Sequence, residues 1–226
     1  MRKQAVNANQ NSEIIGSQMA ATKVLLRCGV AAGPLFLVIF AMQVLVRPEF
    51  RFTRSEPSQL SIGPLGWIQI ANSVIGGLLI VTGALGMRRA LRSNRGRFWG
   101  PLLLGVFGIG QVGGGAFVVD PIRSPTSVTF HGTMHIVCGA VGFVALMAAC
   151  FVFARTFFSR KQRGWAILCT VTGILFLTGF LGAASANQNS TTSIQLFLNL
   201  LFLLEWIWVS SISAQILRNI RTSPTT

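Results

Sequence analysis

The chain has 226 residues, of which 51% are hydrophobic and only 11% are charged. A soluble domain usually carries about 25% charged residues, so this composition excludes an ordinary soluble domain and favours a membrane protein. The net charge of +14 comes from short basic clusters between long apolar runs. That distribution is typical of membrane loops rather than of a nucleic-acid-binding surface, so we expect no nucleic acid as a partner.

Six apolar stretches follow one another along the chain, each close to the length of about 20 residues that a helix needs to cross a bilayer. They predict an all-α fold, a polytopic integral membrane bundle of six transmembrane helices whose partner is the lipid bilayer. The predicted spans lie near residues 24–46, 66–87, 98–119, 131–153, 165–184 and 194–217. Residues 1–23 precede them as a polar tail that we expect to be disordered, and residues 218–226 follow as a short C-terminal tail.

The basic residues indicate how this bundle is oriented in the membrane. Fifteen Lys and Arg fall on one side of the predicted spans and four fall on the other. The four are Arg47, Arg51, Arg54 and Arg123. Cytoplasmic loops are enriched in Lys and Arg, so the split predicts that both tails are cytoplasmic and that the protein is oriented N-in and C-in.

Glycine is concentrated in the third stretch, which reads PLLLGVFGIGQVGGGAFVV. The segment GIGQVG matches a dinucleotide-binding pattern, but that pattern needs a strand before it and a helix after it. In a membrane helix, glycines instead let a neighbouring backbone approach closely. We expect such contacts at Gly105, Gly110, Gly113 and Gly114, with Gly76, Gly77, Gly139 and Gly142 on facing helices. Homo-oligomerisation through this helix is left open.

The segment DPIRSPTSVTFHGTMH, residues 120–135, holds the only Asp and both His of the chain. His131 and His135 are four residues apart, which places both rings on one helix face about 6 Å apart along the axis. With Asp120, they have the residue types of a site for a divalent metal such as zinc. Two alternatives stay open: acid–base chemistry without a metal, and purely structural roles in which Asp120 fixes the turn before Pro121.

A second group of polar residues lies within the spans themselves. Glu205 is about halfway along the sixth stretch, where an acidic side chain costs about 3 kcal/mol on insertion scales. Gln111 and Asn72 are the candidates for its partner. Sorted by depth, most polar side chains fall in the outer halves of the spans, which predicts an outward-opening polar pocket. The residues that we expect to line it are Gln69, Asn72, Gln111, Asn199 and Glu205.

Two segments resemble signatures of the family called domain of unknown function 998. The first is SEPSQLSIGPLGWIQIANSVIGGLLIVTGALGMRRAL, and the second is FVVDP followed by HGTMH. The resemblance extends from about residue 26 to 217. It implies a multi-pass integral membrane protein, largely of bacteria and archaea, with no established activity. It therefore implies a bacterial plasma membrane as the location.

The recurrent polar positions of that family fall here on Ser58, Asp120, His131 and His135. The family usually has an acid and then Leu-Gly after the serine, whereas this chain has residues 59–61 as Gln-Leu-Ser. This departure removes a carboxylate from the outer site.

Three functions fit these observations, and whether the protein is an enzyme is left open. The first is binding of a lipid or small molecule, or a role related to its transport. The second is an intramembrane metal-dependent lipid hydrolase, because the residue types are similar to the zinc sites of alkaline ceramidases and adiponectin-receptor-like proteins. There Asp120, His131 and His135 would hold a metal that activates water, and Ser58 would orient water or substrate. The third is a structural or partner-binding membrane protein.

Overall fold

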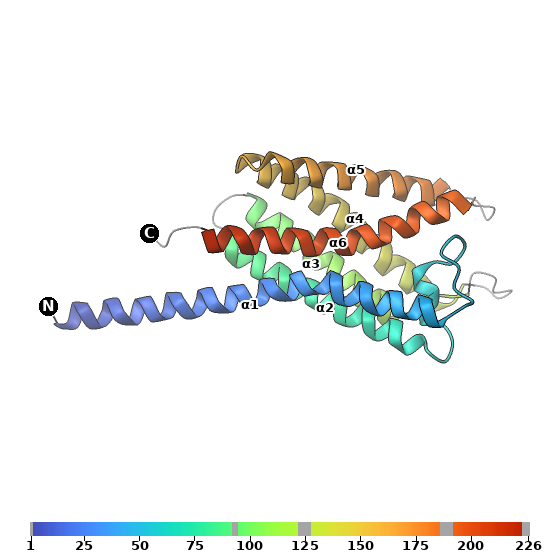
Figure 1. Cartoon of the computed structure of the whole chain (residues 1–226), viewed down its shortest axis with the longest axis horizontal. Helices are drawn as coiled ribbons and strands as arrows, with labels where there is room; N and C mark the ends of the chain where they lie inside the picture. Colours follow the sequence, from blue (N-terminus) through green and yellow to red (C-terminus); the bar gives the residue numbers. More distant parts are fainter. Residues whose placement is uncertain (1, 92–94, 122–127, 186–191, 223–226) are drawn as a thin grey trace.

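The computed structural model describes residues 2–91, 95–121, 128–185 and 192–222, and these parts are helical without any strand. The helices are α1 (Arg2–Val46), α2 (Gly66–Ala90), α3 (Arg95–Ala116), α4 (Phe130–Ser159), α5 (Arg163–Ser185) and α6 (Thr192–Thr222). A short 3-10 helix, η1 (Pro57–Ser61), lies in the α1–α2 loop, residues 47–65. Figure 1 shows the long helices running roughly side by side, so the all-α prediction is confirmed.

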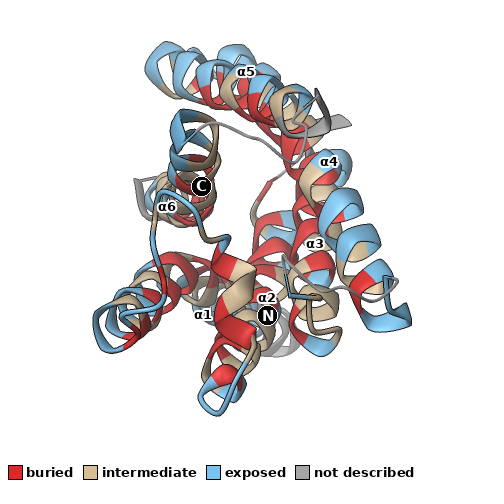
Figure 2. Ribbon diagram, turned by 90° about the vertical axis from the view of Figure 1, so that its right-hand side faces the viewer, coloured by how far each residue is buried: buried red, intermediate tan, exposed pale blue. Residues whose placement is uncertain are grey.

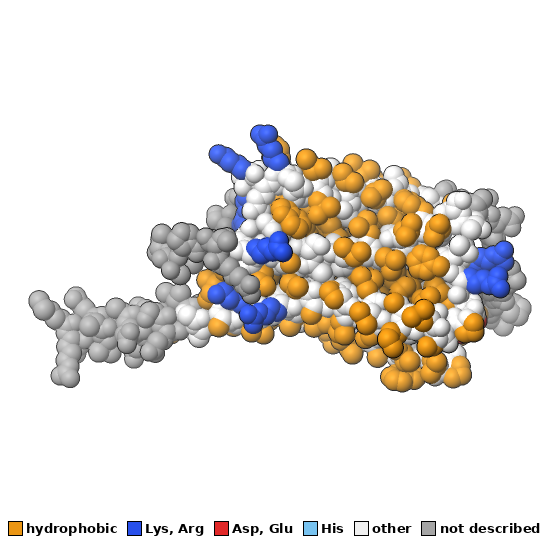
Figure 3. Space-filling view, viewed as in Figure 1, with side chains coloured by type: hydrophobic (Ala, Val, Ile, Leu, Met, Phe, Trp, Pro, Cys, Tyr) orange, Lys and Arg blue, Asp and Glu red, His pale blue; other side chains and the backbone are white. Residues whose placement is uncertain are grey.

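Five of these helices are long and apolar enough to cross a membrane, namely α1, α2, α4, α5 and α6. Helix α3 is the exception, because several glycines and Gln111 lower the mean hydropathy of its sequence. On the face drawn in Figure 3, apolar side chains cover the middle of the body, and most of the visible Lys and Arg side chains lie towards the end where α1 begins. The chain is therefore a multi-pass integral membrane protein.

The first helix differs from the sequence prediction. Residues 2–23, which we expected to be a disordered tail, continue α1 in the structure. This segment contains no Pro, and its only Gly is Gly16. Once the apolar part of α1 has formed, each further residue adds to an existing helix without a new nucleation step.

The six helices form a ring in chain order, and α6 returns to pack against α1. Figure 2 looks along the bundle from the end that carries the α1–α2 loop and shows the helices arranged in a ring. Contact is extensive between successive helices from α1 to α4 and sparse between α5 and α6. Helix α1 begins and α6 ends at the same end of the bundle (Figure 1).

Glycines allow neighbouring helices from α1 to α4 to pack closely. A Cβ atom on Gly83 of α2 would lie 2.6 Å from the Cα of Gly29 on α1. A Cβ on Gly110 of α3 would lie 2.8 Å from the Cα of Gly142 on α4. Backbones this close leave no room for any side chain, as expected for membrane helices that associate through small residues. The prediction for Gly110 and Gly142 is confirmed, whereas Gly139 faces open space.

A stacked aromatic pair connects three helices of the ring. The rings of Phe36 on α1 and Trp206 on α6 are parallel within 8°, with centroids 3.6 Å apart. A Cβ on Gly76 of α2 would lie 2.6 Å from the Trp206 ring, so the absence of a side chain there makes room for the indole. Helices α1, α2 and α6 therefore meet around one large buried side chain.

Substitution of Gly83 by Ala tests the close contact between α1 and α2. The added methyl group has to separate two backbones, so we expect Gly83→Ala to lower the stability by about 1–3 kcal/mol. The control is Gly139→Ala, whose Cβ would have no neighbour within 4 Å. It should leave the stability unchanged or raise it, because Ala favours helix by about 1 kcal/mol over Gly. Thermal unfolding in detergent measures both, and equal midpoints would contradict the contact.

Candidate functional site

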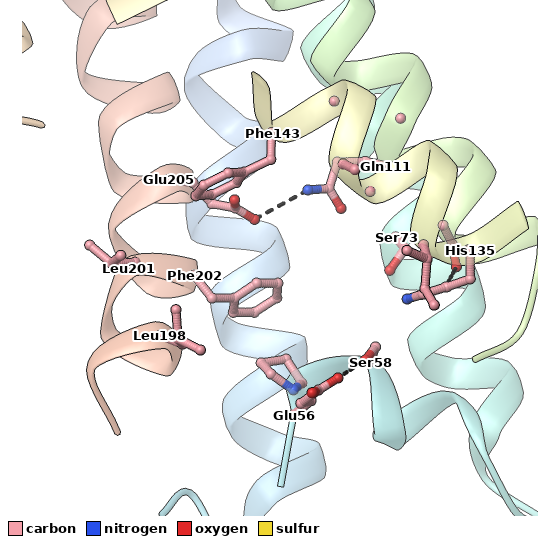
Figure 4. A pocket seen from close by; sticks show the side chains of 18 of the residues that line it. Glu56, Ser58, Ser73, Gln111, His135, Phe143, Leu198, Leu201, Phe202 and Glu205 are labelled. Atoms are coloured by element: carbon pink, nitrogen blue, oxygen red, sulfur yellow. Dashed lines mark hydrogen bonds between the residues drawn. The ribbon is translucent and has the colours of Figure 1, made fainter. Parts of the chain in front are cut away.

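A cavity of about 420 Å³ lies inside the ring, between the α1–α2 loop at one end and the middle of α6 at the other. Its walls come from η1, α2, α3, α4, α5 and α6. The volume falls within the range of about 300–1,000 Å³ that is usual for small-molecule sites. Figure 4 shows Glu205 and Gln111 at the deep end and Glu56 and Ser58 at the end near the loop.

The deep end is closed by a hydrogen bond that crosses the ring. The Nε2 of Gln111 on α3 donates to the Oε1 of Glu205 on α6 at 3.2 Å. Helices α3 and α6 are not closely packed against each other, so this bond spans the cavity rather than a helix interface. Glu205 is only 2% exposed. A carboxyl group at this depth carries a large desolvation cost, and the neutral amide of Gln111 offsets it only in part.

Aromatic rings and glycines form the middle of the cavity. The rings belong to Phe107, Phe143, Phe180 and Phe202. In Figure 4, Phe143 and Phe202 lie on either side of Glu205 along the wall. Phe143 also stacks on Phe180 of α5, with centroids 6.3 Å apart, which keeps both rings in place. The middle wall can therefore accept an apolar body next to a polar deep end.

Hydrogen bonds hold the α1–α2 loop over the other end of the cavity. The buried guanidinium of Arg47 donates from Nη1 to the carbonyl of Leu60 at 2.7 Å. The Nδ2 of Asn199 on α6 donates to the carbonyls of Phe52 at 2.6 Å and Ser55 at 3.0 Å. These bonds anchor the loop to the ends of two helices, so residues 56–58 stand at the mouth in a defined position.

Histidine 135 lies on the α4 side of the cavity. Its Nδ1 is 2.9 Å from the carbonyl oxygen of Gly114 and 2.9 Å from that of Phe117. Carbonyl oxygens only accept hydrogen bonds, so Nδ1 carries the proton in this geometry. The contact ties α4 to the end of α3. It also leaves Nε2 as the ring atom that can accept a hydrogen bond when the ring is neutral.

Asp120 caps the start of α4 instead of facing the cavity. Its Oδ1 accepts from the hydroxyl of Thr129 at 2.7 Å and its Oδ2 from the amide of Thr129 at 2.9 Å. The Thr129 hydroxyl in turn accepts from the amide of Gly132 at 3.0 Å, which makes Thr129 the N-cap of α4. The hydrogen bonds from the Thr129 hydroxyl and amide hold the pKa of Asp120 below its ordinary value of 3.8.

Each of the three residues expected to bind a metal makes contacts of its own with other groups. His131 is exposed and packs edge-on against Phe117 and Phe130, with centroids 5.7 Å and 6.1 Å away. Asp120 bonds Thr129, and His135 bonds carbonyls. Among the described residues, no group of three His, Cys, Asp or Glu could hold a metal ion. The geometry gives the predicted metal site no support and fits the structural alternative for Asp120.

The expected site residues fall into two sets. The ones that line the cavity are Ser58, Gln69, Gln111, His135, Asn199 and Glu205. Outside its lining lie Asp120, His131 and Asn72, of which Asn72 donates to the carbonyl of Phe36 at 3.1 Å and so joins α2 to α1. Sorting by depth did not single out four further polar residues of the lining, Glu56, Ser61, Ser73 and Gln195. The spacing of Gln195, one helical turn before Asn199, was a usable signal.

Fold and cavity together define a multi-pass helical membrane protein with an internal site of mixed polar and aromatic character. A family model described as a protein of unknown function, DUF998, matches residues 30–215. The chain therefore belongs to the DUF998 family, as its sequence signatures indicated. No curated protein and no solved structure matches the chain.

The cap formed by Asp120 predicts a pH-dependent stability. Because the pKa of Asp120 is lower in the folded state than its ordinary value of 3.8, the cap stabilises the fold above that pH. This contribution is lost as the pH falls through the lowered pKa. We expect Asp120→Asn to have a lower unfolding midpoint than wild type at pH 7, with a difference that shrinks below pH 3.8. A constant difference across that range would show that the charge of Asp120 has no part in the cap.

Proposed function

We propose that the protein is a six-span membrane protein with both termini in the cytoplasm, and that it binds a small amphipathic molecule or lipid in the cavity. The observation that carries this proposal is the cavity itself. It combines a carboxyl and an amide at the deep end, aromatic rings in the middle and polar groups at the mouth. Ligand sites are commonly apolar clefts with a few polar groups that fix orientation.

The arrangement of the helices supports six spans. Helix α3 packs between α2 and α4 in the ring, so it lies at the same depth as helices that are apolar enough to cross. An even number of spans places both ends of the chain on one side. Lys23, Arg27, Arg88 and Arg89 belong to that end of the bundle, as do the basic residues of the α4–α5 turn. Arg47, Arg51 and Arg54 are at the other end, and Arg123 lies outside the described residues.

The cavity also has a route to the bilayer. Ile136 and Gly139 of α4 line the cavity, and both residues are exposed. Contact is also sparse between α5 and α6, which line the cavity as well. A ligand with an apolar body can therefore enter from the outer leaflet as well as from water. This favours an amphipathic ligand over a fully polar one.

Binding is better supported than transport. Helix α3 runs without a break from Arg95 to Ala116 past the cavity. Sites of secondary transporters are typically formed by discontinuous helices whose free ends face the substrate. A lipid hydrolase has no observation in its favour, because the predicted metal ligands do not converge.

The proposed orientation predicts the location of the loops. A reporter that is active only outside the cytoplasm should be active when fused after Arg54 and inactive when fused after Leu91 or at the C-terminus. A cytoplasmic fluorescent reporter should give the opposite pattern. The C-terminal fusion also tests α3, because an α3 that does not cross would place the C-terminus on the other side of the membrane. An active C-terminal reporter would overturn the six-span topology.

Substitution of Gly139 by Phe tests the role of the cavity. A Cβ atom at Gly139 meets no atom within 4 Å and Gly139 lines the cavity, so we expect the substitution to place a phenyl group in the cavity. We expect wild type released from detergent in a mass spectrometer to keep a small molecule that Gly139→Phe has lost. The matched control is Gly164→Phe on α5, where a Cβ atom also meets no atom within 4 Å and which does not line the cavity. Equal retention by all three proteins would contradict binding in the cavity.

A further inference from the structure

The charged residues that line the cavity are opposite in sign to the net charge of the chain. The protein has 19 Lys and Arg against 5 acidic residues. The described residues that line the cavity nevertheless include no Lys or Arg, and their ionisable groups are Glu56, Glu205 and His135. Glu56 stands at the mouth and Glu205 at the deep end, so a ligand passes one carboxyl group to reach the other (Figure 4).

The deep end has the features of a cation site. Glu205 is 2% exposed and faces the cavity, and its hydrogen-bond partner across the ring is the neutral amide of Gln111. A buried carboxylate is stabilised most by an opposite charge, which the described cavity lining does not supply. Phe143 and Phe202 present aromatic rings beside the carboxyl group (Figure 4). Aromatic faces attract ammonium groups, and quaternary ammonium ligands are commonly bound this way.

The remaining polar groups of the wall are compatible with a positive ligand. The Nδ1 of His135 donates its hydrogen to two backbone carbonyls. Nε2 is therefore the ring nitrogen that can accept a hydrogen bond when the ring is neutral. Gln69 uses its Oε1 to accept from Gln43 at 2.8 Å, so this oxygen is engaged with the protein. An anionic ligand would meet two carboxyl groups without a basic partner among the described lining residues.

We infer that the ligand of this cavity is a lipophilic cation, an amine or quaternary onium group on an apolar or aromatic body, whose charge pairs with Glu205. This inference rests on the proposed function and specifies the ligand class of the same cavity. Glu56 places a second carboxyl group at the mouth, in a loop that also carries Arg47, Arg51 and Arg54 outside the lining of the cavity. The aromatic wall then holds the body of the ligand while Glu205 holds its charge.

The test compares two probes of the same shape and opposite charge, tetraphenylphosphonium and tetraphenylborate. Binding of each radiolabelled probe is measured on protein in lipid nanodiscs, with empty nanodiscs of the same lipid subtracted. We expect saturable binding of tetraphenylphosphonium to wild type and weaker or no saturable binding of tetraphenylborate. Glu205→Gln, which keeps the size of the side chain and its bond to Gln111, should weaken tetraphenylphosphonium binding by about tenfold or more.

The matched control is Glu49→Gln, which removes the same charge from an exposed residue outside the cavity and should bind like wild type. Glu205→Asp keeps the charge and should keep the preference for the cation, which also covers the case in which Glu205→Gln does not fold. Equal binding of both probes, or binding of tetraphenylphosphonium that Glu205→Gln leaves unchanged, would overturn the cation inference but leave a binding cavity. If neither probe binds wild type saturably, the cation inference also fails, and the Gly139→Phe comparison decides the proposed function separately.

Discussion

Helices in a bilayer gain little from burying apolar side chains against one another, because the surrounding lipid is equally apolar. Close backbone contact has to hold them together instead, and the rest of this structure depends on where such contact is made. From α1 to α4, glycines such as Gly29, Gly83, Gly110 and Gly142 bring neighbouring backbones together. Contact becomes sparse between α5 and α6. The cavity lies inside this unevenly packed ring, and α4, α5 and α6 supply much of its wall.

The same packing decides which polar side chains join two helices and which face the cavity. Between α1 and α2, Asn72 joins α2 to the backbone of α1 and does not line the cavity. Within the cavity, Gln111 and Glu205 reach across the interior towards each other. A polar group inside a membrane protein has to find a partner, and its neighbourhood decides whether that partner is another helix or a ligand. Glu205 is the residue for which a neutral amide alone is a poor match.

The segment between α3 and α4 shows where reasoning from spacing is insufficient. Asp120, His131 and His135 have the residue types of a metal site, and the four-residue spacing does place the two histidines on one helix. The backbone at the start of α4 nevertheless offers closer partners. Thr129 donates hydrogen bonds to both carboxylate oxygens of Asp120, and the Nδ1 of His135 donates to carbonyls at the end of α3. Unsatisfied groups at helix ends are strong local competitors for such side chains, and sequence spacing does not reveal them.

The sequence by itself determined that the chain is helical, that its helices are long and apolar, and that it belongs to the DUF998 family. It also indicated Gln111 and Asn72 as candidate partners of Glu205, because depth along a span follows directly from residue number, and Gln111 is the one that bonds it. Only the tertiary structure decided which polar groups share the cavity and which cap a helix. That choice depends on the rotation of each helix about its axis and on where two backbones cross. Both are set by packing against neighbours that are distant in the chain.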